Sequence, residues 1–167
     1  MIAALTLASV LAAGPQEPEA SLCAPELFRI GRSTNANEIV YEARTRAGSL
    51  DEEEPVDAYW VMRAEEGQRE GLNFLERMLA YGFSVERTPS GDGFTLLLKA
   101  KKDRPLHLTM RDGCPVALAR IDGREALLRS IFVQTSSGEL IPSVAYADVV
   151  GVDPATGDEV RERVVPR

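Results

Sequence analysis

The sequence predicts a mainly β domain: an antiparallel meander of about ten strands, built as a barrel or a two-layer sandwich, with one short helix. From residue 83 onward, short segments of alternating apolar and polar residues recur at nearly even spacing. Asp112-Gly113 and Asp122-Gly123 are typical of two-residue hairpin turns. No crossover helices separate these strands, so a parallel sheet is not expected.

The individual strands follow from alternation and from the turn residues that bound them. The polar stretches 45–56 and 64–71 are expected to be loops. In the segment that follows the first of them, Ala58, Trp60 and Met62 share one face. The expected strands cover residues 27–30, 39–44, 57–63, 83–86, 94–98, 106–110, 115–121, 125–134, 144–152 and 160–165.

A single helix is predicted over residues 74–81. Asn73 and Glu76 have the spacing of a capping box, and Gly82 stands where a left-handed C-cap belongs. A helix this short needs tertiary packing to persist in water. It is expected to share one core with Trp60 through the apolar residues Leu75, Met78 and Leu79.

The N-terminus predicts export, to the periplasm or the exterior. Residues 1–13 are uncharged and apolar, too short to span a bilayer but suited to a signal peptide. Residues 14–24 form a Gly- and Pro-containing linker, which leaves residues 25–167 as a single domain without a transmembrane segment.

The two cysteines, Cys23 and Cys114, are expected to form a disulfide in an exported chain. By closing a large loop, the bridge would stabilise the folded protein by on the order of 4 kcal/mol in the chain-entropy model. The alternative is two unpaired cysteines, each with loop residues as its neighbours.

Several blocks of the sequence resemble one family of exported bacterial domains known only as a domain of unknown function. They cover residues 27–37 with 39–41, then 55–60, 75–83 and the turn at 151–157. The resemblance implies one exported domain over most of the chain. It brings no activity, substrate or catalytic residue.

Composition and motifs argue against several classes of function. The net charge of −7 disfavours nucleic acids and anionic lipid surfaces as partners. Metal sites are not expected, because His107 is the sole histidine and the cysteines lack paired spacing. A Cys114–His107 nucleophile is disfavoured by the expected oxidation of the cysteine. No nucleotide loop or nucleophile elbow is present, and no cofactor is expected.

The remaining hypothesis is a non-enzymatic envelope module that binds a small ligand, a glycan or an envelope protein. Arginine, asparagine and aromatic side chains on loops beside rigid strands are typical of such recognition. One alternative is a hydrolase with a carboxylate pair drawn from Asp57, Glu76 and Asp148. Another is a purely structural envelope component. The candidate ligand-binding residues are Arg32, Asn35, Asn37, Tyr41, Trp60, Arg77 and Tyr81.

Overall fold

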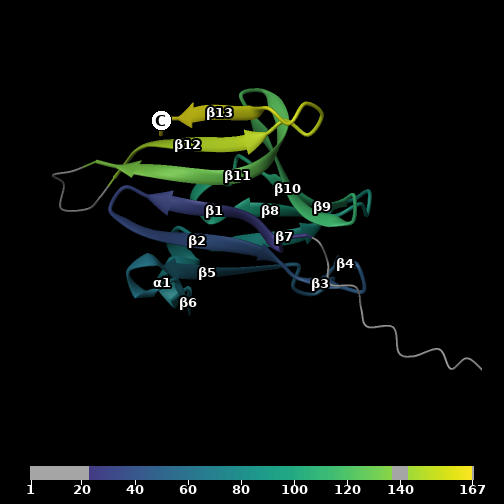
Figure 1. Cartoon of the computed structure of the whole chain (residues 1–167), viewed down its shortest axis with the longest axis horizontal. Coiled ribbons are helices and arrows are strands. Elements are labelled where there is room, and N and C mark those ends of the chain that lie inside the picture. Colours follow the sequence, from purple (N-terminus) through teal and green to yellow (C-terminus); the bar gives the residue numbers. More distant parts are fainter. Residues whose placement is uncertain (1–22, 137–142, 167) are drawn as a thin grey trace, which may run out of the picture.

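The computed structural model describes residues 23–136 and 143–166 (Figure 1). The predicted signal peptide, residues 1–13, and most of the predicted linker lie outside the described residues. Within the described part, no helix has the length and apolar character needed to cross a membrane.

The described residues contain thirteen strands, one α-helix and two 3-10 helices. In chain order they are β1 (Glu26–Arg32), β2 (Asn35–Ala43), β3 (Thr45–Arg46), β4 (Ser49–Leu50), β5 (Val56–Met62), η1 (Arg63–Glu65), β6 (Gln68–Gly71), α1 (Phe74–Leu79), β7 (Phe83–Arg87), β8 (Phe94–Leu98), η2 (Lys99–Lys101), β9 (Leu106–Arg111), β10 (Cys114–Ile121), β11 (Arg124–Thr135), β12 (Val144–Val152) and β13 (Glu159–Val164).

The mainly β fold with one short helix is confirmed. Eleven strands form one curled sheet, and β7 to β13 follow each other as an antiparallel meander. Asp112 and Asp122, with the glycines after them, all have positive φ, as the tight turns of this meander require. The short pair β3–β4 forms a separate two-stranded sheet.

Strand β11 joins the two arms of the sheet. Its first residues pair with β10, while Ser130 to Val133 pair along the same edge with β1, and β12 occupies the opposite edge. One arm continues from β1 through β2 and β5 to β6, and the other from β10 through β9 and β8 to β7 (Figure 1). The sheet therefore has three end strands: β6 and β7 at the ends of the two arms, and β13 beyond β12.

The β1–β11 pair is parallel, an exception in an otherwise antiparallel sheet that the meander pattern did not predict. The twelve residues of β11 extend beyond β10, and a register shift between Leu128 and Ser130 separates the two pairing regions. The second half of the edge is filled by β1, a strand far earlier in the chain. No local crossover unit is involved, so this pairing has no local sequence signal.

The two arms bury one hydrophobic core between them. Alternation places Ile39, Tyr41 and Ala43 of β2 inside. The ring of Tyr41 stacks on Phe28 with 4.4 Å between centroids, and its hydroxyl donates a 2.7 Å hydrogen bond to the carbonyl of Tyr81. Burial raises the pKa of this hydroxyl, which stays protonated and holds the segment after the helix against the core.

Two predicted loops contain strands. Residues 45–56 include the β3–β4 hairpin, and residues 64–71 include η1 and the end strand β6. Every residue of β6 is exposed, so it has no alternation from which sequence could recognise it. Its pairing with β5 defines it instead.

The helix starts as predicted and ends early. Asn73 accepts a hydrogen bond from the Glu76 amide, and the Glu76 carboxylate accepts one from the Asn73 amide, which completes the capping box. The helix ends at Leu79, with Ala80 in right-handed conformation, so the predicted left-handed cap at Gly82 was wrong. Glycine is needed there because a Cβ would lie 1.7 Å from the carbonyl oxygen of Arg77.

The prediction that the apolar face of the helix enters the core was also wrong. Leu72, directly before the helix, is buried and occupies the core position instead. The helix then lies outside the core, with its large apolar side chains 52–73% exposed: Phe74, Leu75, Met78 and Leu79.

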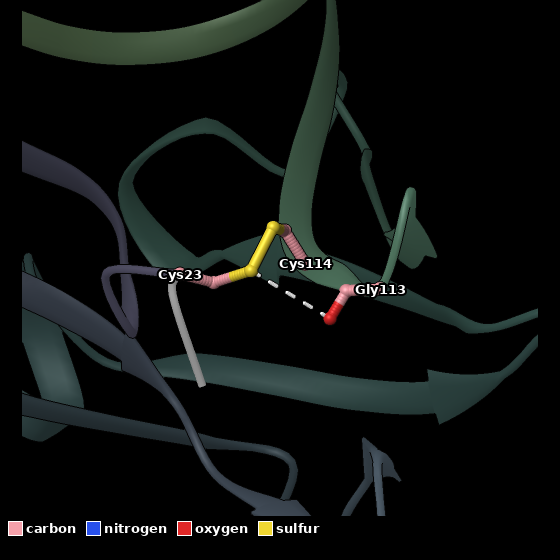
Figure 2. The surroundings of a disulfide bond; sticks show 3 residues. All are labelled: Cys23, Gly113 and Cys114. Carbon is pink, nitrogen blue, oxygen red and sulfur yellow. Dashed lines mark hydrogen bonds between the residues drawn. A yellow bond between two sulfur atoms is a disulfide. The ribbon is translucent and has the colours of Figure 1, made fainter. Parts of the chain in front are cut away.

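The predicted disulfide is present. Cys23 and Cys114 are bonded, with 5.3 Å between their Cα atoms, and the Sγ of Cys23 lies 3.7 Å from the carbonyl oxygen of Gly113 (Figure 2). Cys23 immediately precedes the β1 arm, and Cys114 begins β10 in the other arm. The bond therefore ties the two arms together at one end of the core.

The last strand is held by an ion pair that makes stability depend on pH. Glu162 accepts bonds of 2.9 and 2.5 Å from the Arg104 guanidinium and one of 2.9 Å from the Asp122 amide. The Arg104 bonds and then the Asp122 amide hold the pKa of the Glu162 carboxyl below its usual range. The ionised Glu162 carboxylate stabilises the folded protein fully above the unfolded-state pKa of about 4.3. This contribution is lost as the pH falls through the lower folded-state pKa.

Replacing Glu162→Gln is therefore expected to lower the free energy of unfolding by about 0.5–1 kcal/mol at pH 7, since the pair is partly exposed. The difference from the wild type should shrink below about pH 4. Urea unfolding at pH 7 and pH 3 measures both values. Glu125→Gln removes an exposed carboxylate without an ion pair among the described residues and controls for net charge. A difference that grows toward low pH would contradict the assignment.

Candidate functional site

A pocket of about 210 Å³ lies at one end of the core, where β1, β2, β5 and β6 meet the start of α1. It brings together three of the predicted site residues from three strands. We call it the Arg32 pocket, and it is lined by Arg32, Asn37, Trp60, Met62, Glu70, Gly71, Asn73 and Glu76.

Arg32 ends β1 and lies over the ring of Trp60, with 4.5 Å from its Cζ to the ring centroid. It donates weak hydrogen bonds to the Tyr81 hydroxyl at 3.3 Å and to the Asn35 side-chain oxygen at 3.4 Å. No carboxylate within the described ranges forms an ion pair with it. The guanidinium charge is thus held in place by neutral groups and an aromatic face.

Trp60 forms the aromatic base of the pocket, and Tyr81 packs against Trp60 without lining the pocket. Trp60 lies on the inner face of β5 and is only 5% exposed, which confirms its predicted place in the core. The Tyr81 ring meets it edge-on at 5.5 Å. Tyr41 anchors the Tyr81 backbone and is itself fully buried, so it supports the pocket without lining it.

Asn35 and Asn37 shape the entry of the chain into β2. The side-chain oxygen of Asn35 accepts a 3.1 Å bond from the Asn37 amide. The side-chain oxygen of Asn37 accepts a 3.1 Å bond from the Arg63 amide. These bonds fix the carboxamide of Asn37 at the pocket wall and leave its NH₂ group as a donor for another molecule.

Arg77 is not brought to this pocket. It lies on the other side of the β6–α1 connection, where its Nε donates a 2.9 Å bond to the Leu72 carbonyl. There it borders a larger cleft of about 460 Å³. The predicted set therefore divides between two hollows of the surface.

The carboxylates considered for hydrolysis lie on separate elements, and each is engaged in a local contact. Asp57, on β5, forms an ion pair with Arg44, and Glu76 caps α1. Asp148, on β12, accepts two hydrogen bonds from Arg163 on β13. His107 is half-buried, with its Nε2 3.6 Å from an oxygen of Asp92. Among residues 23–136 and 143–166, no three His, Cys, Asp or Glu side chains converge as a metal site would require.

Sequence reasoning missed the β6 and α1 side of the pocket. Met62, Glu70 and Gly71 line it because β6 pairs with β5, and that pairing carries no local signal. The capping box did identify Asn73 and Glu76, but only as helix residues. With the β6 and α1 residues included, the pocket has hydrogen-bond donors in Arg32 and the asparagine side chains, and an acceptor in Glu70.

Comparison with known proteins identifies the family. A family profile described as "Domain of unknown function (DUF4833)" matches residues 28–163, nearly all of the described domain. The searches gave no match among curated proteins and none among solved structures. Because the profile covers most of the sequence, the chain belongs to the DUF4833 family of domains of unknown function.

Proposed function

We propose that the protein is a non-enzymatic binding module of the cell envelope, exported by its N-terminal segment, which recognises an anionic group on a small ligand, glycan or protein at the Arg32 pocket. The observation that carries the proposal is the guanidinium of Arg32, fixed on Trp60 without a carboxylate partner among the described residues. A carboxylate or phosphate supplies the charge that this arrangement lacks.

The other groups of the pocket favour a ligand that is polar as well as anionic. The NH₂ group of Asn37 offers a donor, and the Glu70 carboxylate, across the ladder from Trp60, offers an acceptor. Acidic sugars and amino-acid carboxylates carry both an anion and hydroxyl or ammonium donors. Export is supported by the uncharged apolar N-terminus and is consistent with a disulfide-bonded domain.

A thermal-shift screen with acidic sugars, cell-wall peptides and inorganic phosphate tests this proposal. A true ligand present at a hundred times its dissociation constant is expected to stabilise the protein by about 2.7 kcal/mol. Arg32→Met, which keeps an apolar chain over Trp60 but removes the charge, should abolish the shift, and Asn37→Ala should reduce it. Arg129→Met, on the exposed part of β11, is the matched control and should leave the shift unchanged.

The proposal fails if no compound raises the melting temperature of the wild type. It also fails if a compound does so equally in Arg32→Met. The first result would favour a structural role for the domain, and the second would place the ligand elsewhere on the surface.

A further inference from the structure

The 460 Å³ cleft lies where the curled sheet fails to close. Its walls are the start of β5 and the end strand β7, which face each other across the opening. Strand β6 covers only the later half of β5, from Tyr59 to Met62, and leaves Val56 and Ala58 without a neighbouring strand on that side. We call this opening the β5–β7 seam.

The β7 edge of the seam offers unpaired backbone groups. The Lys99 amide bonds to the Gly82 carbonyl and the Thr88 amide to the Gly93 carbonyl, which fixes the register of the β7–β8 ladder. Because hydrogen-bonded pairs alternate along an antiparallel ladder, the amides and carbonyls of Phe83 and Val85 point away from β8. Both residues line the seam, and neither amide has a hydrogen bond within the described part of the chain.

The β5 edge contributes in the same way. The Arg44 amide bonds to the Pro55 carbonyl, so the backbone amides and carbonyls of the odd-numbered residues of β5 point toward β2. Those of the even-numbered residues point the other way, which at Val56 and Ala58 is toward the seam. The Ala58 amide is already bonded to the side chain of Asp57, and the Ala58 carbonyl lies toward Leu72 at the end of the β5–β6 ladder. Both backbone groups of Val56 are without a hydrogen bond to another backbone group in the described part of the chain. Two sheet edges thus meet at one groove, as they would on either side of a missing strand.

The side chains of the seam suit an extended chain with an acidic residue. Its floor is apolar and consists of Val56, Ala58, Leu72, Phe83 and Val85. At the Gly82 end lie Arg77 and Lys99, neither of which has a carboxylate partner among the described residues. Toward the opposite end, Arg44 pairs with Glu54 and Asp57, whereas Glu53 forms no ion pair with any residue that the structure describes.

We propose that the β5–β7 seam binds an extended peptide segment of a partner protein by strand addition to β7. The peptide would bond to the backbone of Phe83 and Val85, place alternate apolar side chains on the floor, and direct an acidic residue to Arg77 and Lys99. The site shares no lining residue with the Arg32 pocket, and it stands independently of the function proposed for that pocket.

Hydrogen exchange of the free protein tests the edge first. The amides of Phe83 and Val85 are expected to exchange faster than those of Ser84 and Glu86, which bond to β8. On addition of a binding peptide, protection should rise at Phe83 and Val85 and stay unchanged at Ser84 and Glu86. Protection of Phe83 and Val85 equal to that of their neighbours before any peptide is added would overturn the proposal.

Selection from a random seven-residue peptide library, with the disulfide-bonded full chain as bait, supplies the probe. Enriched peptides, synthesised with a fluorophore, are expected to contain an acidic residue and alternating apolar residues. N-methylation of the backbone amides that face β7 should weaken binding about tenfold or more, because it removes hydrogen bonds and adds a steric clash.

Two variants locate the peptide. Lys99→Glu reverses a rim charge and should weaken binding about tenfold, whereas Lys102→Glu makes the same change outside the seam and should not. Val85→Pro removes the outward amide without touching the β8 ladder and should also weaken binding; circular dichroism checks that it folds. If Val85→Pro does not fold, the N-methylated peptide measures the same contact from the other side.

Three further outcomes would overturn the proposal. The first is a library that enriches no peptide. The second is binding that is insensitive both to N-methylation and to Lys99→Glu. The third is a dimer of the full chain, detected by light scattering and abolished by Lys99→Glu, which would show that a second copy occupies the seam.

Discussion

Replacing both cysteines, Cys23→Ser with Cys114→Ser, is expected to lower the free energy of unfolding by about 4 kcal/mol. The two residues are 91 positions apart, so the bond removes a large closed loop from the freedom of the unfolded chain. It also fixes the residues before β1 to β10, across the two arms of the sheet. Guanidinium unfolding of the oxidised wild type and the double variant measures the difference.

Reductant provides the matching control. Dithiothreitol should move the unfolding midpoint of the wild type to that of the double variant, and it should leave the double variant unchanged. A wild-type midpoint that does not respond to full reduction would show that the bond contributes no stability.

The second large effect is expected at Trp60. Trp60→Ala should cost about 3–5 kcal/mol, because it removes a large buried side chain and leaves a cavity at the base of the Arg32 pocket. Arg32 and Tyr81 would each lose the aromatic face on which they rest. Because Trp60 is the chain's sole tryptophan, unfolding should be followed by far-ultraviolet circular dichroism.

Leu79→Ala is the control for the loss of a large apolar side chain. Leu79 is 71% exposed on α1, so its replacement should change stability by no more than about 0.5 kcal/mol. Equal losses in the two variants would mean that the helix packs on the core after all. A small loss at Trp60 would mean that its ring is not part of the core.

Local signals in the sequence predicted the meander and the start of the helix. Asp112-Gly113 and Asp122-Gly123 adopt the positive φ angles that their hairpins need, and Asn73 with Glu76 forms the capping box. In each case, the residues that determine the geometry are adjacent or within one turn.

Features that depend on distant partners were missed. The edge strand β6 has no apolar alternation and exists through its pairing with β5. The helix has the apolar spacing of a core-facing helix, but Leu72 fills the core position before the helix begins. Spacing shows that a face is apolar; it does not show what lies opposite that face.

The candidate site was predicted in part for the same reason. Arg32 and Asn37 are joined by the β1–β2 hairpin, so their proximity follows from the local chain. Trp60 joins them because Ile39 pairs with Trp60 across β2 and β5, a register that composition does not specify. Arg77 was predicted with them by its side-chain type, yet it borders the larger cleft, while Tyr81 contacts Arg32 and Trp60.

The parallel pairing of β1 with β11 also bears on the order in which the chain folds. The β1–β2–β5 arm can form its own hairpins early. The free edge of β1, however, has no partner until Ser130 to Val133 have been synthesised and the β10–β11 hairpin has formed. Contacts between such distant segments slow folding, so we expect a folding time nearer seconds than microseconds. During that interval, the β1 edge is an unpaired strand to which another nascent chain can attach, and assembly of β11 on β1 is the step that ends this exposure.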